Sequence, residues 1–387
     1  MPTLDIAMPI ALFAVVIVAL LLNKRTEEKL MTTVEHREFK IRDIILLVVF
    51  MAIIVSALAY AAMVNPGALF EDVILIFFLS SYTMLLFIIS YVFSGLTKIK
   101  AQLLSIGFGS ASVVAGIACS LAPLRDSFTI LRVGAFIGLA AFCFGVAVYE
   151  QYKPSLKQRW FIAAQPPAIF VLLFVFFNII NNSGTISVWA PYLMDVFALT
   201  FAILIILYLS SLFTWKTVAL FAVLLTSMDI ILVIGSSVML TAATSFSGLG
   251  LPVLVVLPNI PFVVGTNPVT HLSVIEYQAL GLGDYFFAGI LAVQTSKKFG
   301  LNTAIIATIA MAVSFGIWEA FLQDIIHDLI PILGRNIEGW PATTCMLTGW
   351  VPVVAWKLLS DRKKATKITV VNKSPQVPKE QSSLPVE

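Results

Sequence analysis

Two aspartates lie in the middle of apolar stretches of the chain. Asp229 interrupts ALFAVLLTSMDIILVIGSSVML, and Asp284 interrupts YQALGLGDYFFAGILAV. A carboxylate in hydrocarbon is costly, so acids in such runs are rare and usually functional. Two carboxylates in contact share a proton; one can activate a water while the other donates a hydrogen bond to a carbonyl. These two residues therefore suggest an acid pair built for chemistry inside a membrane, and hydrolysis of an amide bond is one reaction that such a pair can perform.

Glycines frame the second aspartate, in the order Gly281-Leu282-Gly283-Asp284. Without side chains, Gly281 and Gly283 allow another backbone to approach the acid and loosen a helix locally. The same acids are also compatible with a proton or cation pathway, because intramembrane carboxylates mark such pathways. Pairing with a basic group and capping of a broken helix are the structural alternatives.

The elements that position these acids are predicted to be membrane-spanning helices. The 387 residues are 59% hydrophobic and 12% charged, with a mean hydropathy of +0.99. A soluble domain carries about 25% charged residues. Apolar runs of roughly 20 residues recur along the chain, and their length favours helices over barrel strands. The composition predicts an all-α polytopic bundle of about 9–11 spans, with the lipid bilayer as its surroundings and no nucleic-acid partner.

Eleven spans follow from the twenty-residue rule. They are 4–22, 44–64, 73–95, 102–122, 128–149, 160–180, 189–213, 216–239, 277–295, 302–322 and 341–358. We expect an N-terminal transmembrane bundle over 1–215 and a catalytic transmembrane core over 216–358. Residues 359–387 are polar and contain three prolines, which predicts a disordered cytoplasmic tail.

The orientation of the spans follows from the basic residues in the loops. Every second loop is basic, beginning with the segment of Lys24 and Arg25 and ending with Arg362 at the start of the tail. The alternate loops are nearly free of Lys and Arg; Arg125 and Arg335 are the exceptions. This alternation predicts an odd number of spans, with the N-terminus outside and the C-terminus in the cytoplasm, most simply of the cell membrane.

The remaining reactive side chains give no sign of a cofactor. Three cysteines lie in or near apolar spans and three histidines are scattered, so neither a disulfide framework nor a metal site is predicted. We expect no cofactor and no metal.

The connection over 240–276 contains an apolar run, Leu251–Pro258, that is bracketed by prolines and too short to span a membrane. One interpretation is a loop or re-entrant piece packed on the bundle. The other is an extended edge, including Leu254 and Val255, that pairs with an extended substrate backbone.

The two aspartates are predicted to lie at similar depth. Asp229 is about ten residues, or about 15 Å, from the outer end of the helix over 216–239. Asp284 is about seven residues, or about 10 Å, from the outer end of the helix over 277–295. Because these helices are consecutive and antiparallel, we expect the two carboxyl groups to meet in the outer half of the membrane.

The stretch ALGLGDYFFAGIL, residues 279–291, closely resembles the Gly-x-Gly-Asp segment of the presenilins and signal peptide peptidases, which are intramembrane aspartyl proteases. In that family an aspartate-bearing helix is followed by a Pro-bounded apolar strand, the Gly-x-Gly-Asp helix, and a Pro-Ala-Leu turn before the last helix. This chain has Asp229, then 251–258, then 281–284, then Pro341-Ala342-Thr343. The resemblance covers 216–358, and the short loops are similar to those of archaeal members.

The resemblance implies a catalytic pair, Asp229 and Asp284, that cleaves transmembrane helices of single-span proteins or signal peptides. It implies that the active site is shaped by Gly281, Leu282, Gly283, Pro341, Ala342, Thr343, Leu254 and Val255. The chain departs from the family at two positions, with Met228 where a tyrosine is usual and Thr343 in place of leucine. The family has nine spans with the aspartates on the sixth and seventh, whereas here they are on the predicted eighth and ninth.

The predicted orientation resembles that of signal peptide peptidase and implies substrates with cytoplasmic N-termini. Two other functions use the same acids. A proton-coupled transporter would move its substrate without cutting a peptide bond, and a prepilin-type peptidase, which also carries Gly-x-Gly-Asp, would cut at the cytoplasmic border. A catalytically silent scaffold is a third alternative.

Overall fold

The computed structural model describes most of the chain. The described residues are 5–33, 38–64, 68–121, 127–152, 159–180, 189–235, 249–261, 264–266, 273–275, 277–333 and 339–372. Nearly all of the regular structure in them is helical, which confirms the predicted all-α class. Nine helices of the described ranges are long and apolar enough to cross a membrane, so the chain is a multi-pass membrane protein.

Each of the eleven predicted spans corresponds to helical structure in the described residues. The helices are α1 (Ala7–Thr33), α2 (Ile41–Val64), α3 (Ala68–Val92), α4 (Lys98–Cys119), α5 (Thr129–Tyr152), α6 (Trp160–Ala163), α7 (Gln165–Phe174), η2 (Val175–Ile179), η3 (Trp189–Leu193), α8 (Met194–Leu209), α9 (Trp215–Ile230), η4 (Ile231–Gly235), α11 (Leu282–Phe299), α12 (Leu301–Leu333) and α13 (Ala342–Asn372). Here η marks a π-helical turn that continues or opens an α-helix.

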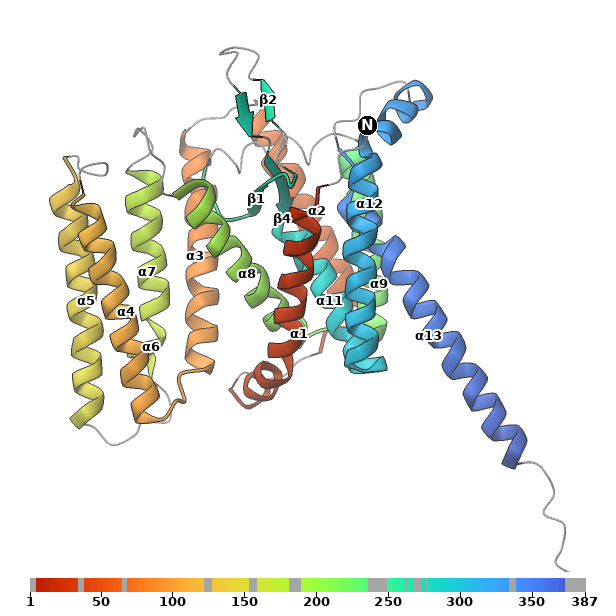
Figure 1. Cartoon of the computed structure of the whole chain (residues 1–387), viewed down its shortest axis with the longest axis horizontal. Coiled ribbons are helices and arrows are strands. Elements are labelled where there is room, and N and C mark those ends of the chain that lie inside the picture. Colours follow the sequence, from red (N-terminus) through yellow and green to blue (C-terminus); the bar gives the residue numbers. More distant parts are fainter. Residues whose placement is uncertain are drawn as a thin grey trace, which may run out of the picture.

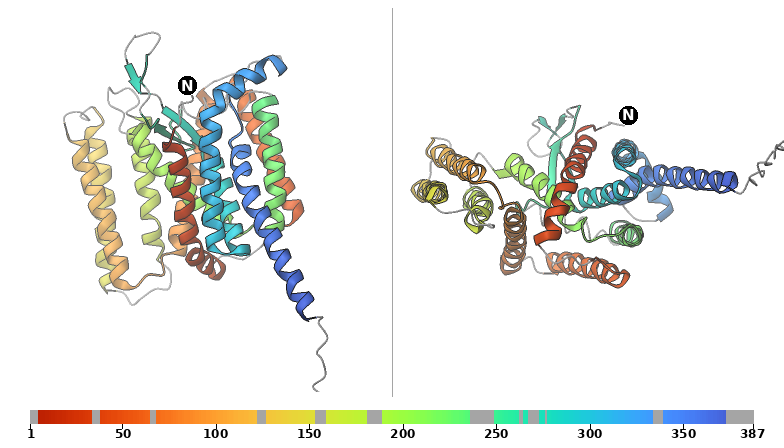
Figure 2. Two further views of the ribbon diagram at one scale, coloured as in Figure 1. Left: turned by 45° about the vertical axis from the view of Figure 1, so that its right-hand side comes forward. Right: turned by 90° about the horizontal axis from the view of Figure 1, so that it is seen from below.

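The helices form two groups (Figures 1 and 2). We call α4, α5, α6, α7 and η2 the peripheral unit, which lies at one side of the molecule beyond α3. We call α1, α8, α9, α11, α12 and α13 the core unit, which lies on the other side together with α2 (Figure 1). The boundary between the groups follows α3 and α8, since α3 contacts both α7 and α8.

α11 is the central helix of the core unit. It contacts α1, α8, α9, α12 and α13, and its residues from Tyr285 to Thr295 are all buried. α11 is not one of the nine helices that are apolar enough to span alone. Its surroundings explain this, because a helix enclosed by other helices does not need a lipid-facing apolar surface. The helix that carries Asp284 is therefore held by protein rather than by lipid.

The helix ends next to the basic segments meet at one end of the bundle. Contacts of basic side chains join these ends. Lys297 Nζ lies 2.7 Å from Glu27 Oε1, and two lysines lie over aromatic rings, with Lys29 Nζ 4.7 Å from the Phe93 ring centre and Lys298 Nζ 4.2 Å from the Trp215 ring centre. Two further basic side chains donate to carbonyl oxygens, Lys98 Nζ to that of Gln151 at 2.7 Å and Arg159 Nη1 to that of Leu96 at 2.6 Å. The ends of α1, α3, α5 and α11 thus lie with the starts of α4, α6 and α9. This is the arrangement that the alternation of basic loops predicts.

A short antiparallel ribbon lies before α11. Strand β1 (Leu254–Pro258) pairs with β4 (Tyr277–Gly281), with Leu254 opposite Gly281 and Pro258 opposite Tyr277. A second pair, β2 (Val264–Thr266) and β3 (Ser273–Ile275), forms the far end of the connection. Of the two interpretations of 251–258, the extended one agrees with β1, but the partner of β1 in the structure is the segment that leads into Asp284.

The ribbon corrects one predicted helix. Residues 277–281 were expected at the start of a helix over 277–295, but they form β4, and α11 begins at Leu282. The physical reason is main-chain pairing with β1, which the Leu282 amide continues by donating to the Val253 carbonyl oxygen at 2.9 Å. Asp284 therefore lies in the first turn of its helix instead of near its middle.

The last two helices are longer than predicted. α12 continues past 322 to Leu333, and α13 continues past 358 to Asn372. The expectation of a disordered tail from 359 is thus wrong for 359–372, where no proline interrupts the helix and Lys357 and Asp361 form an i,i+4 ion pair at 3.4 Å. The rest of the predicted tail, 373–387, lies outside the described residues, as do Arg125 and Arg335.

The peripheral unit packs along a seam of small residues. The buried residues of α4 are Ala101, Ser105, Gly109, Ser112, Gly116 and Cys119, spaced by three or four. Such a stripe allows two membrane helices to approach closely, and α4 packs along α5. A buried ion pair closes the unit at the basic end, where Arg159 Nε lies 2.8 Å from Glu150 Oε2. Arg159 also donates to the carbonyl oxygens of Ser94 and Leu96, which ties the unit to α3.

Candidate functional site

Three helices of the core unit bring the predicted site residues together. α9 carries Asp229, α11 carries Asp284, and α13 begins directly after Pro341. Each of these helices contacts the other two. The segments that the sequence placed far apart, around 229, 284 and 341, therefore form one site.

The two aspartates lie at comparable distances from the basic end of the bundle. The rings of Trp215, at the start of α9, and Phe299, at the end of α11, are 5.3 Å apart. From this contact, Asp229 is about 21 Å along α9 and Asp284 about 22 Å along α11. The two carboxylates are close enough to interact electrostatically. Because residues 277–281 form β4, Asp284 is not seven residues from the outer end of its helix, as the sequence predicted. The two acids nevertheless lie at similar distances from the basic end of the bundle.

Asp229 is held by a side chain of the Pro341 turn. The carboxyl group is buried, with 8% of the residue exposed, and Oδ2 accepts a 2.8 Å hydrogen bond from Thr343 Oγ1. Thr343 itself is 1% exposed. No basic side chain among the described residues forms an ion pair with Asp229. The structural alternative in which Asp229 neutralises a cation therefore has no support in this part of the chain.

Asp284 lies at a more open position in the first turn of α11. It is partly exposed, and the neighbouring Gly283 is exposed. A Cβ built on Gly281 would lie 3.3 Å from Asp284 Oδ2, so the carboxyl group rests against the Gly281 backbone. A Cβ built on Gly283 would meet nothing within 4 Å. The glycines thus have different roles: Gly281 makes room for the carboxyl group, and Gly283 leaves open space beside it.

The strand β4 offers a free main-chain edge that leads to Asp284. In an antiparallel pair, alternate residues direct their N–H and C=O groups to the partner strand. Leu282 and Leu280 are directed to β1, whereas Tyr277, Ala279 and Gly281 are directed away from it. No backbone hydrogen bond to another described segment uses the Ala279 amide or carbonyl. An extended peptide added at this edge would lead toward Gly281 and the two acids.

The free edge does not belong to the segment that the sequence favoured. Leu254 and Val255 were expected to contact substrate, but both lie in β1, and Val255 is fully buried against the bundle. The other edge of β1 is also occupied, because the Val256 amide donates to Asp195 Oδ1 at 2.7 Å. β1 therefore supports β4, and its outer edge is occupied at Val256. The sequence signal for this was Asp195, an acid near the end of an apolar run.

The Pro341 turn is fixed by aromatic and threonine side chains. Trp340 donates from Nε1 to Thr344 Oγ1 at 2.8 Å, and Thr344 Oγ1 in turn donates to the Pro341 carbonyl oxygen at 2.7 Å. The ring of Trp340 stacks on that of Trp318 of α12, with centres 5.5 Å apart and planes 12° from parallel. The turn is thus clamped against α12. Ala342, the first residue of α13, is partly buried and forms no side-chain polar contact.

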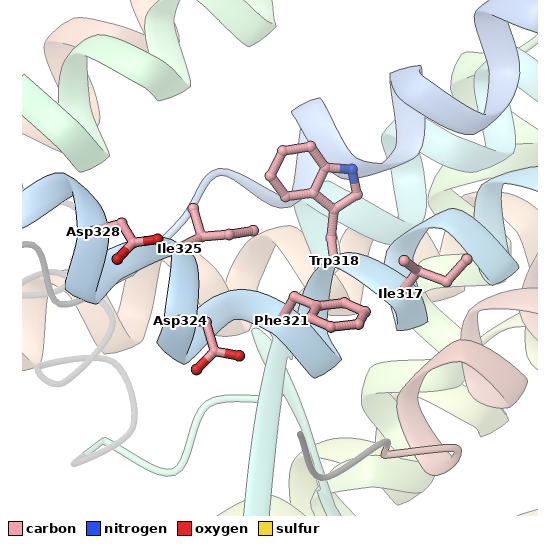
Figure 3. Close-up of a pocket in the computed structure, with 6 residues that line it drawn as sticks. All are labelled: Ile317, Trp318, Phe321, Asp324, Ile325 and Asp328. Carbon is pink, nitrogen blue, oxygen red and sulfur yellow. The ribbon is translucent and has the colours of Figure 1, made fainter. Parts of the chain in front are cut away.

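A pocket lies along α12, and Trp318 is one of its lining residues. It has a volume of about 360 Å³ and is lined by Ile317, Trp318, Phe321, Asp324, Ile325 and Asp328, all on α12 (Figure 3). None of the predicted site residues lines it. We therefore treat the pocket as separate from the pair of aspartates, although it shares Trp318 with the clamp.

The described residues contain no group of three or more His, Cys, Asp or Glu side chains that could hold a metal ion. The two carboxyl groups, with open space beside one of them, are the candidate reactive groups of the site. Such a pair can hold a water between an ionised and a protonated carboxyl group.

No protein-family model, curated protein or solved structure matches the chain.

Proposed function

We propose that the protein is an intramembrane aspartyl endopeptidase that cleaves transmembrane helices of single-span proteins or signal peptides. The observation that carries the proposal is that Asp229 and Asp284 lie on contacting helices, close enough to interact electrostatically, without a cation paired to either acid among the described residues. The Gly-x-Gly-Asp motif at 281–284 and the turn at Pro341 resemble those of presenilins and signal peptide peptidases. A membership of that family is part of the proposal.

The chemistry requires only water and the two acids. The ionised aspartate takes a proton from water as the water oxygen bonds to the scissile carbonyl carbon, and the protonated aspartate gives its proton to the carbonyl oxygen. The resulting gem-diol collapses when the aspartate that took the proton from water gives it to the amide nitrogen, one gem-diol hydroxyl group gives its proton to the other aspartate, and the C–N bond breaks. The products are a carboxylic acid and an amine, and the pair of aspartates again holds one proton. No covalent enzyme intermediate forms.

The substrate is proposed to bind as an added strand at the free edge of β4. A helical amide is shielded by its own hydrogen bonds, so the substrate must unwind before water reaches the carbonyl carbon. Main-chain bonds to Ala279 would replace those lost on unwinding. The open space at Gly283 gives the unwound backbone access to Asp284.

The orientation in the cell membrane is also proposed. The basic residues gather at one end of the bundle, and the positive-inside rule places that end in the cytoplasm. The two aspartates then lie toward the outer side, with the N-terminus outside and the C-terminus inside. Substrates with cytoplasmic N-termini are expected to be cut in preference to those of opposite orientation.

Replacement of the acids tests the chemistry. The unaltered chain, Asp229→Asn and Asp284→Asn are purified and placed in vesicles with a single-span helix that carries a fluorophore and a quencher. Cleavage is expected only with the unaltered chain, while all three proteins retain the same helix content. Full activity of Asp284→Asn would overturn the mechanism. Cleavage by none of them, together with a pH-dependent flux that either substitution abolishes, would establish a transporter instead.

Replacement at the strand edge tests the binding mode. Ala279→Pro removes the outward N–H of β4, and prolines are tolerated at such edges because no ladder bond is lost. Cleavage is expected to fall at least about tenfold, since one hydrogen bond is lost and the ring blocks the edge. Ala279→Val is the matched control, because it keeps the N–H. Equal activity of the two variants would show that the substrate does not add to β4.

A further inference from the structure

The hydrogen bond between Thr343 and Asp229 differs from the other threonine contacts in the helices. Thr83, Thr295 and Thr308 each donate to the carbonyl oxygen four residues earlier in the same helix, at 2.6–2.8 Å. That is the usual contact of a threonine inside a helix. Thr343 lies in the first turn of α13 and donates across to another helix, α9.

The geometry around Thr343 fixes the direction of its hydroxyl group. Trp340 and Thr344 hold the Pro341 turn against α12, and Thr343 follows directly after Ala342 with 1% of its surface exposed. A hydroxyl group has one proton to donate, and an ionised carboxylate can only accept. The contact therefore favours the ionised form of Asp229 with Oδ2 occupied.

Oδ1 of Asp229 accepts no hydrogen bond from the described residues. With Oδ2 held by Thr343, Oδ1 is the atom left for the attacking water or for the proton shared with Asp284. A carboxylate held by one oxygen keeps a single orientation through the reaction, which is the kind of positioning that catalysis needs.

We propose that Thr343 is a positioning residue that holds the Asp229 carboxylate in its reactive orientation. The proposal rests on the proposed function and adds to it a role for the turn: the clamp at Trp318 and Trp340 places the Thr343 hydroxyl group, and the hydroxyl group places Asp229. The resemblance to presenilins does not supply this role, because the corresponding position there is leucine, which has no hydroxyl group.

Three variants at this position test the proposal. Thr343→Val keeps the side-chain shape and removes the hydroxyl group, Thr343→Ser keeps the hydroxyl group, and Thr343→Ala removes both. With the same single-span reporter, kcat is expected to fall about 10- to 100-fold for Thr343→Val and Thr343→Ala, because a hydrogen bond to a charged group is lost. KM is expected to stay within about twofold, and Thr343→Ser is expected to recover most of the activity. The matched control is Thr308→Val, whose hydroxyl group bonds only its own helix.

A second measurement does not depend on activity. The unfolding midpoint is compared for Thr343→Val in the unaltered chain and in an Asp229→Ala background. If Thr343 holds Asp229, the valine lowers the midpoint in the first case and has little effect in the second, because the partner is already gone. Equal shifts in both backgrounds would overturn the contact, and an unchanged kcat in an active chain would overturn the positioning role. A chain that cleaves nothing in any form would overturn the proposed function, and the unfolding comparison would still decide whether Thr343 holds Asp229.

Discussion

The peripheral unit and the core unit are both built from apolar helices, but their buried surfaces differ in kind. The peripheral unit buries a stripe of small residues between α4 and α5, and its buried ion pair of Glu150 and Arg159 lies at the end of the helices. The core unit buries Asp229 and Thr343 between helices, about 21 Å from its basic end. Polar groups at a helix end can close a bundle, whereas an acid inside a bundle, without a counter-charge among the described residues, needs another explanation.

A first way to break the comparison is to remove the carboxylate of the peripheral ion pair. Glu150→Gln leaves Arg159 buried without its counter-charge, and removal of one partner of a buried pair costs about 3–5 kcal/mol. We expect α5 and α6 to separate from α3 at a lower denaturant concentration, measured by limited proteolysis, while cleavage per folded molecule is unchanged. Loss of cleavage in the folded protein would show that the peripheral unit is part of the active machinery.

A second test places a methyl group inside the core unit. A Cβ at Gly349 of α13 would collide with the Ala310 carbonyl group of α12, and a backbone atom cannot move aside as a side chain can. Gly349→Ala is therefore expected to cost about 2–3 kcal/mol of the free energy of unfolding. Because the same helix pair carries the Pro341 turn, cleavage is expected to fall as well. Unfolding curves and reporter cleavage measured on one preparation check both effects.

The matched substitution in the peripheral unit sharpens the contrast. A Cβ at Gly109 of α4 would lie 2.9 Å from the ring of Phe144, a side chain that can shift. Gly109→Ala is expected to cost about 1 kcal/mol or less and to leave cleavage unchanged. Gly138, where a Cβ would meet nothing within 4 Å, is the control for the methyl group itself. An equal loss of stability for Gly109→Ala and Gly349→Ala would remove the distinction between the two regions.

Much of the fold follows from the sequence, because hydrocarbon thickness imposes a length on each apolar run. The spans near 128–149 and 216–239 lie within about three residues of α5 and about four of α9 with η4. The alternation of basic loops likewise predicts which helix ends meet. The start of α11 could not be predicted in this way, since strand pairing between β1 and β4 is a contact between segments about twenty residues apart and leaves no periodicity in so short a run.

Part of the site could also be predicted from the sequence, because acids are rare in membrane spans. An acid in an apolar run is conspicuous, so Asp229 and Asp284 stand out in the sequence, and the structure places them on contacting helices. The contact of Thr343 with Asp229 was not predictable, because threonine is common in membrane helices and usually bonds its own backbone. Likewise, only the register shows that Ala279, rather than Val255, lies on the free edge.

The enclosure of α11 by other helices has a consequence for how the protein is made. A helix that is not apolar enough to remain in lipid alone must find its neighbours during insertion. Three of them, α1, α8 and α9, precede it in the chain, and α12 and α13 follow. During synthesis α11 therefore follows three of its five neighbours, and Asp284 enters the bilayer after Asp229.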